Sequence, residues 1–503
     1  MKPAAKALAI LLVFLGVAVR AEPLVTAPSG VFRGVADSGG MLAFRGIRYA
    51  ASPAGPHRWQ APRQPLRPAG TIDATAYGPA CLQPAPASTT SEDCLFLNVW
   101  TTGTDAKEKR PVMVYIHGGG FLSGSGNIPG ETLASRGVVV VSMNYRLGPL
   151  GFMAHEALPR KVANFGLLDM VAALDWVQRN ISAFGGDPDN VTLFGVSAGG
   201  QAVNMLMVSP LAAGKFHRAI AQSGYAAWAL PRSKTAPVPA PLAADLGPAE
   251  SAEAASRALV ARVDPRAGSA AQLERLDGQA LVNAVRGFQL PIVDGSSLPE
   301  EPAFLFLRGQ QAAVPFMTGG NSFEGSDMPQ SGITPDALER MLGSDFAALQ
   351  RLYAEDFEVG RDRGIARLFG DYRYLLSARL LATSMARVGQ DAWLYYVDLA
   401  PGQRQPGWPG TPHGYDLSLL LDTDRNASAE TRLLGERMRR YWIEFARHGR
   451  PDPAGLASWQ PCCADADRWM VLGDRDAMQE SVIKEKLDLL ANRHSRRLSL
   501  RKP

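Results

Sequence analysis

The chain alternates short apolar runs with longer stretches in which apolar residues recur at helical spacing. The apolar runs, which are typical of buried strands, cover residues 112–116, 138–142, 191–194, 314–318, 393–397 and 469–472. Between the second and third runs, apolar side chains recur at helical spacing from Leu167 to Ile181 and stop at Gly185 and Gly186, which predicts an amphipathic helix. Strands separated by crossover helices predict a mostly parallel sheet with helices on both faces.

Two stretches interrupt this alternation. Five prolines between residues 231 and 248 predict an irregular excursion rather than a domain linker, because strands resume beyond it. Residues 251–286 have a helical pattern, and we expect them to cover one side of the candidate site. The sequence contains no internal repeat, so we expect residues 22–503 to form one catalytic domain with inserted loops.

The first 21 residues have the pattern of a signal peptide. Lys2 and Lys6 precede an apolar run over residues 7–19, and small residues stand where signal peptidase reads the chain. About 20 apolar residues are needed to span a bilayer, so this run is too short to be a membrane anchor. We expect cleavage after Ala21 and export to the periplasm or the medium, without stable membrane insertion.

Charge and cysteine content add further limits. The formal net charge of +4 over 503 residues is nearly balanced, and the basic segment at 493–502 is expected to be a solvated end rather than a nucleic-acid arm. Cys81 and Cys94 flank a short loop, and a bridge between them would contribute roughly 3 kcal/mol. The state of the adjacent Cys462 and Cys463 stays open. No Cys or His pairs have zinc-like spacing, so we expect no metal.

The strongest chemical signal is Gly-Val-Ser-Ala-Gly at residues 195–199. It follows a predicted strand and precedes a helix, which is the context of a nucleophile elbow. The sharp turn would project the Ser197 hydroxyl clear of the sheet, and the start of the helix would place free N–H groups near developing negative charge. Ser197 is therefore the predicted nucleophile of an acyl-transfer reaction.

A serine hydroxyl needs a base, and hydrolases with this elbow have the order serine, acid, histidine. That order favours His413 and His448 among the seven histidines. His413 lies in a loop after a predicted strand, where catalytic groups are usually displayed. His448 ends a helical pattern and is better explained as a residue near a helix C-terminus. We predict that His413 is the base.

The acid is expected between these two residues in the chain. Glu324 comes just after the predicted strand at 314–318 and is favoured by that position. Asp294 and Asp327 are rivals, although Asp294 is better explained by the turn at 291–299. From loop position alone, the choice among these carboxylates stays open.

Three glycines after the strand at 112–116 suggest an oxyanion hole. In His-Gly-Gly-Gly at residues 117–120, backbone N–H groups can converge on one point without side-chain obstruction. Together with the N–H of Ala198, they would bind the oxyanion of a tetrahedral intermediate, and losing one such donor typically costs about 3–4 kcal/mol.

With these motifs in place, the chain resembles the type-B carboxylesterase/cholinesterase family over most of its length, as in its bacterial secreted members. The shared segments are EDCLFLNV at 92–99, HGGGF at 117–121, NYR at 144–146, NFGLLD at 164–169, FGGDP at 184–188 and FHRAI at 216–220. The resemblance implies an α/β-hydrolase fold and a serine carboxylesterase that works through an acyl-enzyme, with a small-molecule ester as substrate and no cofactor.

The same resemblance assigns individual residues. It implies that Glu324 is the triad acid and that His413 is the triad histidine. The oxyanion donors implied are Gly119, Gly120 and Ala198, and the family's first disulfide corresponds to Cys81 and Cys94.

The sequence also departs from the family pattern. Val196 stands where the family usually has glutamate, and the loop at 82–93 lacks the aromatic residue with which choline esterases bind a cation. Choline esters are therefore disfavoured. The alternatives are a catalytically inactive binding or adhesion member of the fold, a lipase, or a specialised polyester or toxin esterase. Candidate pocket residues are Trp228, Phe288, Phe323 and Tyr372.

Overall fold

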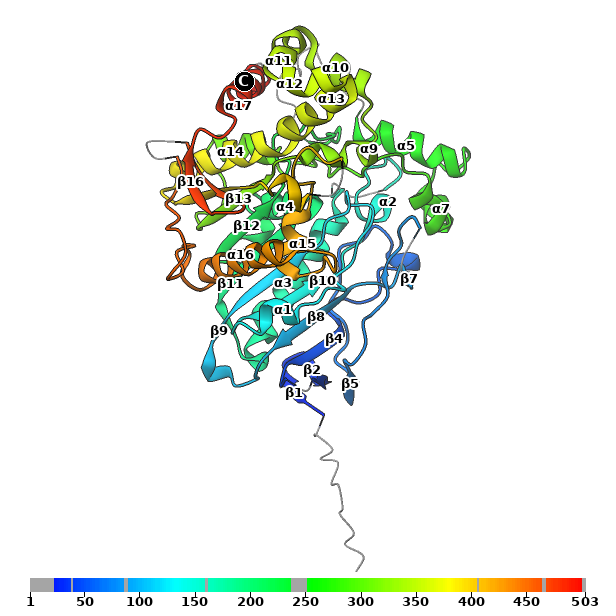
Figure 1. Ribbon diagram of the computed structural model, residues 1–503. Helices are drawn as coiled ribbons and strands as arrows, with labels where there is room; N and C mark the ends of the chain where they lie inside the picture. Colours follow the sequence, from blue (N-terminus) through cyan, green and yellow to red (C-terminus); the bar gives the residue numbers. More distant parts are fainter. Residues whose placement is uncertain are drawn as a thin grey trace, which may run out of the picture.

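A mixed sheet of eleven strands organises the described part of the chain (Figure 1). The computed structural model describes residues 22–499 except 38, 86–88, 159–161, 237–250, 405–406 and 464–466. The predicted signal peptide and most of the proline-rich excursion lie outside these residues. The strand order is β16 (Ala477–Glu480), β15 (Arg468–Leu472), β14 (Ala392–Val397), β13 (Phe316–Asn321), β12 (Arg218–Gln222), β11 (Gly186–Val196), β9 (Arg110–Ile116), β10 (Val139–Met143), β8 (Phe96–Thr101), β4 (Leu42–Arg48), β3 (Val35–Ala36).

The centre of this sheet is parallel and its edges are antiparallel. Strands β15 through β10 pair in parallel, whereas β16, β8, β4 and β3 pair antiparallel with their neighbours. All six predicted apolar runs overlap strands of the parallel centre, so the predicted sheet is confirmed. The prediction lacked β12, whose short sequence RAIAQ mixes small and polar residues.

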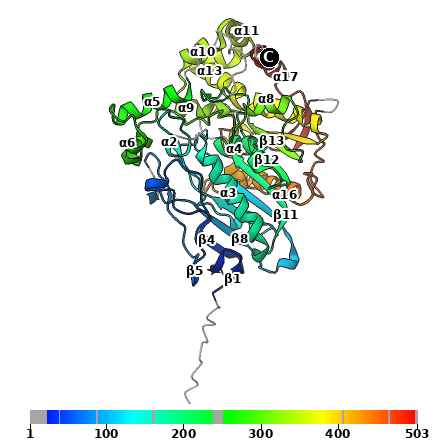
Figure 2. The ribbon, with the colours of Figure 1, turned by 180° about the vertical axis from the view of Figure 1, so that it is seen from behind.

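Helices cover both faces of the sheet because its central strands bury both sets of alternate side chains. Along β9, Val112, Val114 and Ile116 pack in one core cluster, whereas Met113 and Tyr115 pack in the other. The first cluster includes residues of α3 (Phe165–Asn180), α4 (Ala198–Leu206) and α14 (Leu376–Ser384). The second includes α1 (Glu131–Ala134), α15 (Tyr415–Leu421) and α16 (Ala429–His448). Helix α16 lies in front of the sheet in Figure 1, and α3 does so in Figure 2, the view from behind.

Further helices gather beyond one edge of the sheet and above it. The helical pattern predicted at 251–286 splits into α5 (Ala252–Val263), α6 (Ala270–Arg275) and α7 (Gly278–Asn283). Within the described residues, no helix is long and apolar enough to cross a membrane. The other helices are α2 (Gly148–Gly151), α8 (Pro302–Leu307), α9 (Met328–Ser331), α10 (Pro335–Leu342), α11 (Phe346–Leu352), α12 (Ala354–Val359), α13 (Arg361–Gly370) and α17 (Lys484–Ser499).

Smaller elements complete the chain near its start. Strands β1 (Leu24–Ala27), β2 (Gly30–Arg33) and β5 (Thr71–Asp73) form a separate three-stranded sheet. Strand β6 (Ala80–Cys81) pairs with β7 (Thr90–Ser91), which lies inside the loop closed by a disulfide between Cys81 and Cys94. Cys462 and Cys463, whose state the sequence left open, are bonded to each other.

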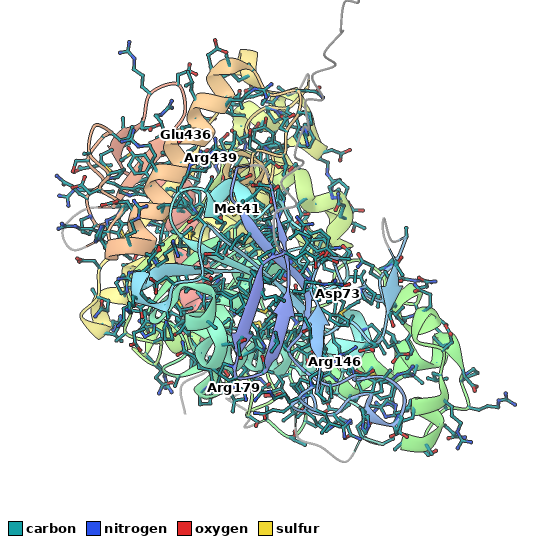
Figure 3. The ribbon with its side chains drawn as sticks, turned by 90° about the horizontal axis from the view of Figure 1, so that it is seen from below. Met41, Asp73, Arg146, Arg179, Glu436 and Arg439 are labelled. Atoms are coloured by element: carbon teal, nitrogen blue, oxygen red, sulfur yellow. A yellow bond between two sulfur atoms is a disulfide. The ribbon has the colours of Figure 1, made fainter. Side chains whose placement is uncertain are left out.

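A buried ion pair connects the loop after β10 to helix α3. Arg146 follows β10 and donates through its backbone N, Nε and Nη2 to the carboxylate of Asp169 in α3, at 3.0, 2.8 and 2.8 Å. Figure 3, which views the molecule from below, shows Glu436 and Arg439 near each other on α16, well away from Arg146. Asp169 is fully buried and Arg146 is 3% exposed, so this pair links the loop after β10 to α3 in the interior.

Candidate active site

Ser197 stands at a strained turn between the central strand β11 and helix α4. Its backbone has φ 59° and ψ −122°, in a region that side chains rarely adopt. Its amide donates to the carbonyl oxygen of Gln222 in β12 at 2.8 Å, which holds the turn against the neighbouring strand. This geometry is the elbow expected from the sequence.

The glycines on either side of Ser197 are required by close backbone contacts. A Cβ atom on Gly195 would lie 2.6 Å from the carbonyl oxygen of Ile116, and one on Gly199 would lie 2.0 Å from the same atom. Both distances are shorter than any tolerable contact, so β11 and α4 can approach β9 only because side chains are absent.

The three glycines after β9 form a tight loop beside this turn. Gly119 and Gly120 have φ values of 95° and 61°, and neither amide donates a hydrogen bond within the described residues. The N–H of Ala198 is the first of helix α4 and has no acceptor inside that helix. All three amides thus keep their donor capacity, as an oxyanion hole requires.

His117 begins this glycine loop, and its imidazole is buried and neutral. Burial lowers the pKa of His117 to about 4, so its ring carries no charge near pH 7. The ring stacks on Tyr145 with centroids 4.3 Å apart, and its Nδ1 lies 2.9 Å from the carbonyl oxygen of Gly118. The Tyr145 hydroxyl donates to the His117 carbonyl at 2.8 Å. We infer that His117 is a structural support for the loop.

Glu324 and His413 meet although 89 residues separate them in the chain. Glu324 follows β13 and is 1% exposed, and its Oε2 lies within hydrogen-bond distance of Nδ1 of His413. Its Oε1 accepts hydrogen bonds from the Ser223 hydroxyl at 2.7 Å and from the Asn321 backbone N at 2.5 Å. The carboxylate is therefore fixed on one side and faces the imidazole on the other.

The other ring nitrogen of His413, Nε2, is not held by a hydrogen bond in the described part of the chain. This nitrogen is buried, and it lies 3.9 Å from Oδ2 of Asp327. Burial acts to lower the pKa of His413, but the charges of Asp327 and Glu324 outweigh it and raise the pKa to about 9. His413 is thus held by Nδ1, while Nε2 is available to another group.

The rivals considered from the sequence lie in different surroundings. Asp294 is buried in its own turn, where it accepts hydrogen bonds from Ala163, Ser297 and Leu298. His448 is the last residue of α16. Asp327, in contrast, stands in the site and accepts a hydrogen bond from the Tyr374 hydroxyl.

The structure brings in polar residues that the sequence reasoning did not select. Asn321 donates through Nδ2 to both Glu324 and Asp416, at 3.0 and 3.2 Å. Asp416 also accepts hydrogen bonds from Gln222 and Tyr395, at 2.8 and 2.7 Å. Asp416 lies three residues after His413 in the HGYD motif, which was the one available signal for it.

A cavity of about 380 Å³ connects these groups. It is lined by the predicted nucleophile and base together with the three glycines at 118–120, and also by Val196, Phe288 and Asp327. Phe288 and Asp327 thus supply an aromatic ring and a carboxylate to this cavity, at other positions than the two that the family pattern uses.

A second cavity of about 540 Å³ shares the Phe288 wall with the first. It is lined mainly by apolar side chains, including Trp228, and by residues of α5. Of the four pocket candidates, Phe288 and Trp228 line a cavity. Phe323 and Tyr372 are buried against Trp408 and Trp228, respectively.

Known proteins resemble this chain over most of its length. A sequence model of the carboxylesterase family matches residues 21–490. The chain belongs to this family. As a carboxylesterase it has the α/β-hydrolase fold and is a serine esterase that hydrolyses carboxylic esters.

The similarity extends along nearly the whole carboxylesterase. Its sequence is 34% identical over 466 residues to fumonisin B1 esterase of Sphingopyxis macrogoltabida, covering 86% of this chain and 83% of that protein. It is 32% identical over 504 residues to para-nitrobenzyl esterase of Bacillus subtilis, covering 92% and 97%. The solved structure of carboxylesterase Est55 from Geobacillus stearothermophilus aligns with a TM-score of 0.78 at 27% identity, covering 93% and 99%.

Proposed function

We propose that Ser197 is the nucleophile, His413 the general base and Glu324 the acid that orients it. The amides of Gly119, Gly120 and Ala198 would bind the oxyanion. The observation that carries this assignment is the asymmetry of His413, whose Nδ1 faces a buried carboxylate while its Nε2 makes no hydrogen bond in the described part of the chain and belongs to a ring that lines the Ser197 cavity. A triad histidine needs this arrangement, because one nitrogen must be held and the other must exchange a proton.

In the proposed reaction, Nε2 of His413 takes the Ser197 proton as Oγ attacks the ester carbonyl carbon. The carbonyl oxygen becomes an oxyanion, and the three amides stabilise it. Collapse of this intermediate breaks the bond to the alcohol oxygen, which receives the proton from His413. Water then attacks the acyl-enzyme in the same way and releases the acid and free Ser197. Glu324 stabilises the imidazolium throughout.

Active-site labelling tests the assignment directly. A fluorophosphonate probe should label the wild-type enzyme, and Ser197→Ala should abolish both labelling and hydrolysis of 4-nitrophenyl butyrate, with kcat falling by about 10⁶-fold. Ser123→Ala is the matched control, because Ser123 lines the same cavity and should remain dispensable. Unchanged labelling of Ser197→Ala would contradict the proposal, and absence of labelling in the wild type would favour an inactive binding protein.

We infer that the substrate is a bulky ester rather than a short one. The second, mainly apolar cavity adjoins the first at Phe288, and the similarity to a protein named fumonisin B1 esterase supports a specialised esterase as the second candidate. Rates with fumonisin B1, with 4-nitrophenyl esters of increasing length and with acetylthiocholine would rank these substrate classes. A lipase should instead be activated at an oil–water interface.

We also propose that residues 1–21 are removed during export and that residues 22–503 are the mature catalytic domain. Two disulfides support an oxidising compartment, since such bonds persist mainly outside the cytosol. N-terminal sequencing of the exported protein should begin at Glu22. Recovery of intact Met1 in the cell interior would contradict this proposal.

A further inference from the structure

Arg373 is a deeply buried cation close to the catalytic cavity. It lies in a π-helical segment, Asp371–Leu375, which interrupts the passage from α13 to α14. Its side chain is almost completely inaccessible, with the whole residue 2% exposed. Single π-helical turns inside α-helices occur frequently at functional sites, because they place a side chain that regular helical geometry would direct elsewhere.

Aromatic rings surround the guanidinium group. The distances from its Cζ atom to the ring centroids range from 4.2 to 5.7 Å. Stacking of this kind satisfies the faces of the guanidinium plane but leaves the N–H donors at its edge, which point within the plane. The rings are those of Tyr225, Trp228, Phe288, Phe369 and Tyr374.

Two of the three nitrogens of the guanidinium group have no acceptor in the described part of the protein. Both Nε and Nη2 of Arg373 are buried without a hydrogen-bond partner, and no carboxylate there lies within 4.0 Å of the group. The hydroxyl oxygen of Tyr225, whose ring is 4.2 Å from Cζ, is also buried without a partner. A buried charge that is neither neutralised nor fully hydrogen-bonded is strongly unfavourable, so these donors are expected to serve a ligand.

The unsatisfied donors lie next to the wall that the two cavities share. Phe288 and Trp228, two of the rings on Arg373, line the cavities, and Phe288 packs so closely on the oxyanion loop that a Cβ on Gly120 would lie 2.2 Å from it. Side-chain rotations at binding sites are common. Phe288 therefore stands between the Ser197 cavity and the guanidinium group, and its rotation would uncover Arg373 toward that cavity.

We propose that Arg373, assisted by the Tyr225 hydroxyl, binds a free carboxylate on the acyl part of the substrate. The preferred substrates would then be half-esters of dicarboxylic or polycarboxylic acids. A carboxylate fits the fork of a guanidinium group by accepting two parallel hydrogen bonds. The acyl side is favoured over the alcohol side, because the leaving alcohol must face Nε2 of His413, where the Asp327 carboxylate would repel an anion. This inference rests on the proposed function.

Two esters with acyl chains of equal length test the proposal. The first is mono-4-nitrophenyl glutarate, whose chain ends in a carboxylate, and the second is 4-nitrophenyl pentanoate, whose chain ends in a methyl group. Arg373→Met should lower kcat/KM for the glutarate by about 10- to 100-fold and change that for the pentanoate by less than about threefold. Arg373→Lys should recover part of the difference. Spontaneous hydrolysis, which the neighbouring carboxylate accelerates, is subtracted with Ser197→Ala.

The matched control is Arg286→Met, since Arg286 is an exposed arginine that lines the second cavity. It should leave the ratio of the two kcat/KM values unchanged. An equal loss for both esters in Arg373→Met would overturn the proposal in favour of a structural role. A changed ratio in Arg286→Met alone would overturn it in favour of the exposed cation.

A measurement on the wild-type enzyme covers the case in which Arg373→Met does not fold. Free glutarate should inhibit hydrolysis of the pentanoate ester at a concentration at least about tenfold lower than pentanoate does, and equal inhibition would overturn the proposal. If the pentanoate ester is hydrolysed through Ser197 while Arg373 has no effect on the glutarate, the carboxylate site is refuted and the proposed function stands. Without Ser197-dependent hydrolysis of either ester, the proposed function itself fails.

Discussion

Two buried arginines show how differently this protein treats a charge in its interior. Arg146 directs its backbone N, Nε and Nη2 to Asp169, and only its Nη1 lacks a partner within the described residues. Arg373 is equally buried, but it has aromatic rings on its faces and no carboxylate within ion-pair distance in that same part of the chain. The first charge is neutralised by the fold, whereas the second remains available.

The same contrast separates the two regions around these residues. In the Arg146 region, the buried charge is paired with Asp169. Arg146 also lines a small cavity together with the disulfide between Cys81 and Cys94, and we expect both features to stabilise the fold. The proposed catalytic region leaves groups without a hydrogen bond among the described residues, including Nε2 of His413 and the amides of Gly119 and Gly120. Substitutions in the first region should therefore alter stability, and those in the second should alter chemistry.

The largest effect expected within this comparison concerns Glu324, the carboxylate that faces Nδ1 of His413. Glu324→Gln keeps the size of the side chain but removes the charge that we propose orients His413, so kcat for 4-nitrophenyl butyrate should fall by about 10⁴-fold. Glu355→Gln, on an exposed face of α12, should have no effect. A loss of less than tenfold in Glu324→Gln would mean that another carboxylate, such as Asp327, orients the imidazole.

A substitution that breaks the pair of Arg146 and Asp169 should lower the stability of the protein rather than its hydrolytic rate. Asp169→Asn leaves the Arg146 charge uncompensated in the interior, so the free energy of unfolding in urea should fall by about 3–5 kcal/mol. Asp175→Asn is the matched control, because Asp175 lies on the same helix in a partly exposed pair with Lys215 and should cost no more than about 1 kcal/mol. Equal stability of the two variants would remove the distinction between the regions.

The disulfide of the Arg146 region should have a smaller effect. Replacing Cys81 and Cys94 together by serine should lower the free energy of unfolding by about 3 kcal/mol, because the bond closes a loop of about 14 residues in the unfolded chain. The same relation predicts only about 1 kcal/mol for the adjacent Cys462 and Cys463. Equal losses in both double variants, measured by urea titration, would contradict this explanation.

The smallest expected effect concerns the pH dependence of activity, which depends on the pKa of His413. His413 must be neutral to act as a base, so kcat/KM should fall as the pH drops through about 9, the pKa of its imidazole. The Asp327 charge favours the imidazolium, so Asp327→Asn should lower the pKa and move this limb to lower pH by about one unit. An unchanged limb in the pH profile of Asp327→Asn would show that Asp327 does not act on His413.

Much of this protein could be predicted because its local patterns agree with its fold. The apolar runs predicted the parallel centre of the sheet. Of the three residues that the chain order selected, Ser197 and His413 line one cavity and Glu324 contacts His413, while their catalytic roles stay a proposal. Strand β12 was not predicted, because its residues have no strong pattern and become a strand only between β11 and β13. Asp327 was predicted as a rival acid. The structure shows that it lies 3.9 Å from Nε2 of His413, whereas Glu324 contacts Nδ1.

The sequence by itself determined the elbow, the glycine loop and the reaction class, because each depends on residue types that are adjacent in the chain. It could not determine which buried polar groups are satisfied, since that depends on side chains brought together from distant segments. Arg146 and Arg373 are both arginines near apolar residues in the sequence. Only the tertiary structure places Asp169 beside Arg146 and five aromatic rings around Arg373, because packing sets the distances at which a charge is neutralised.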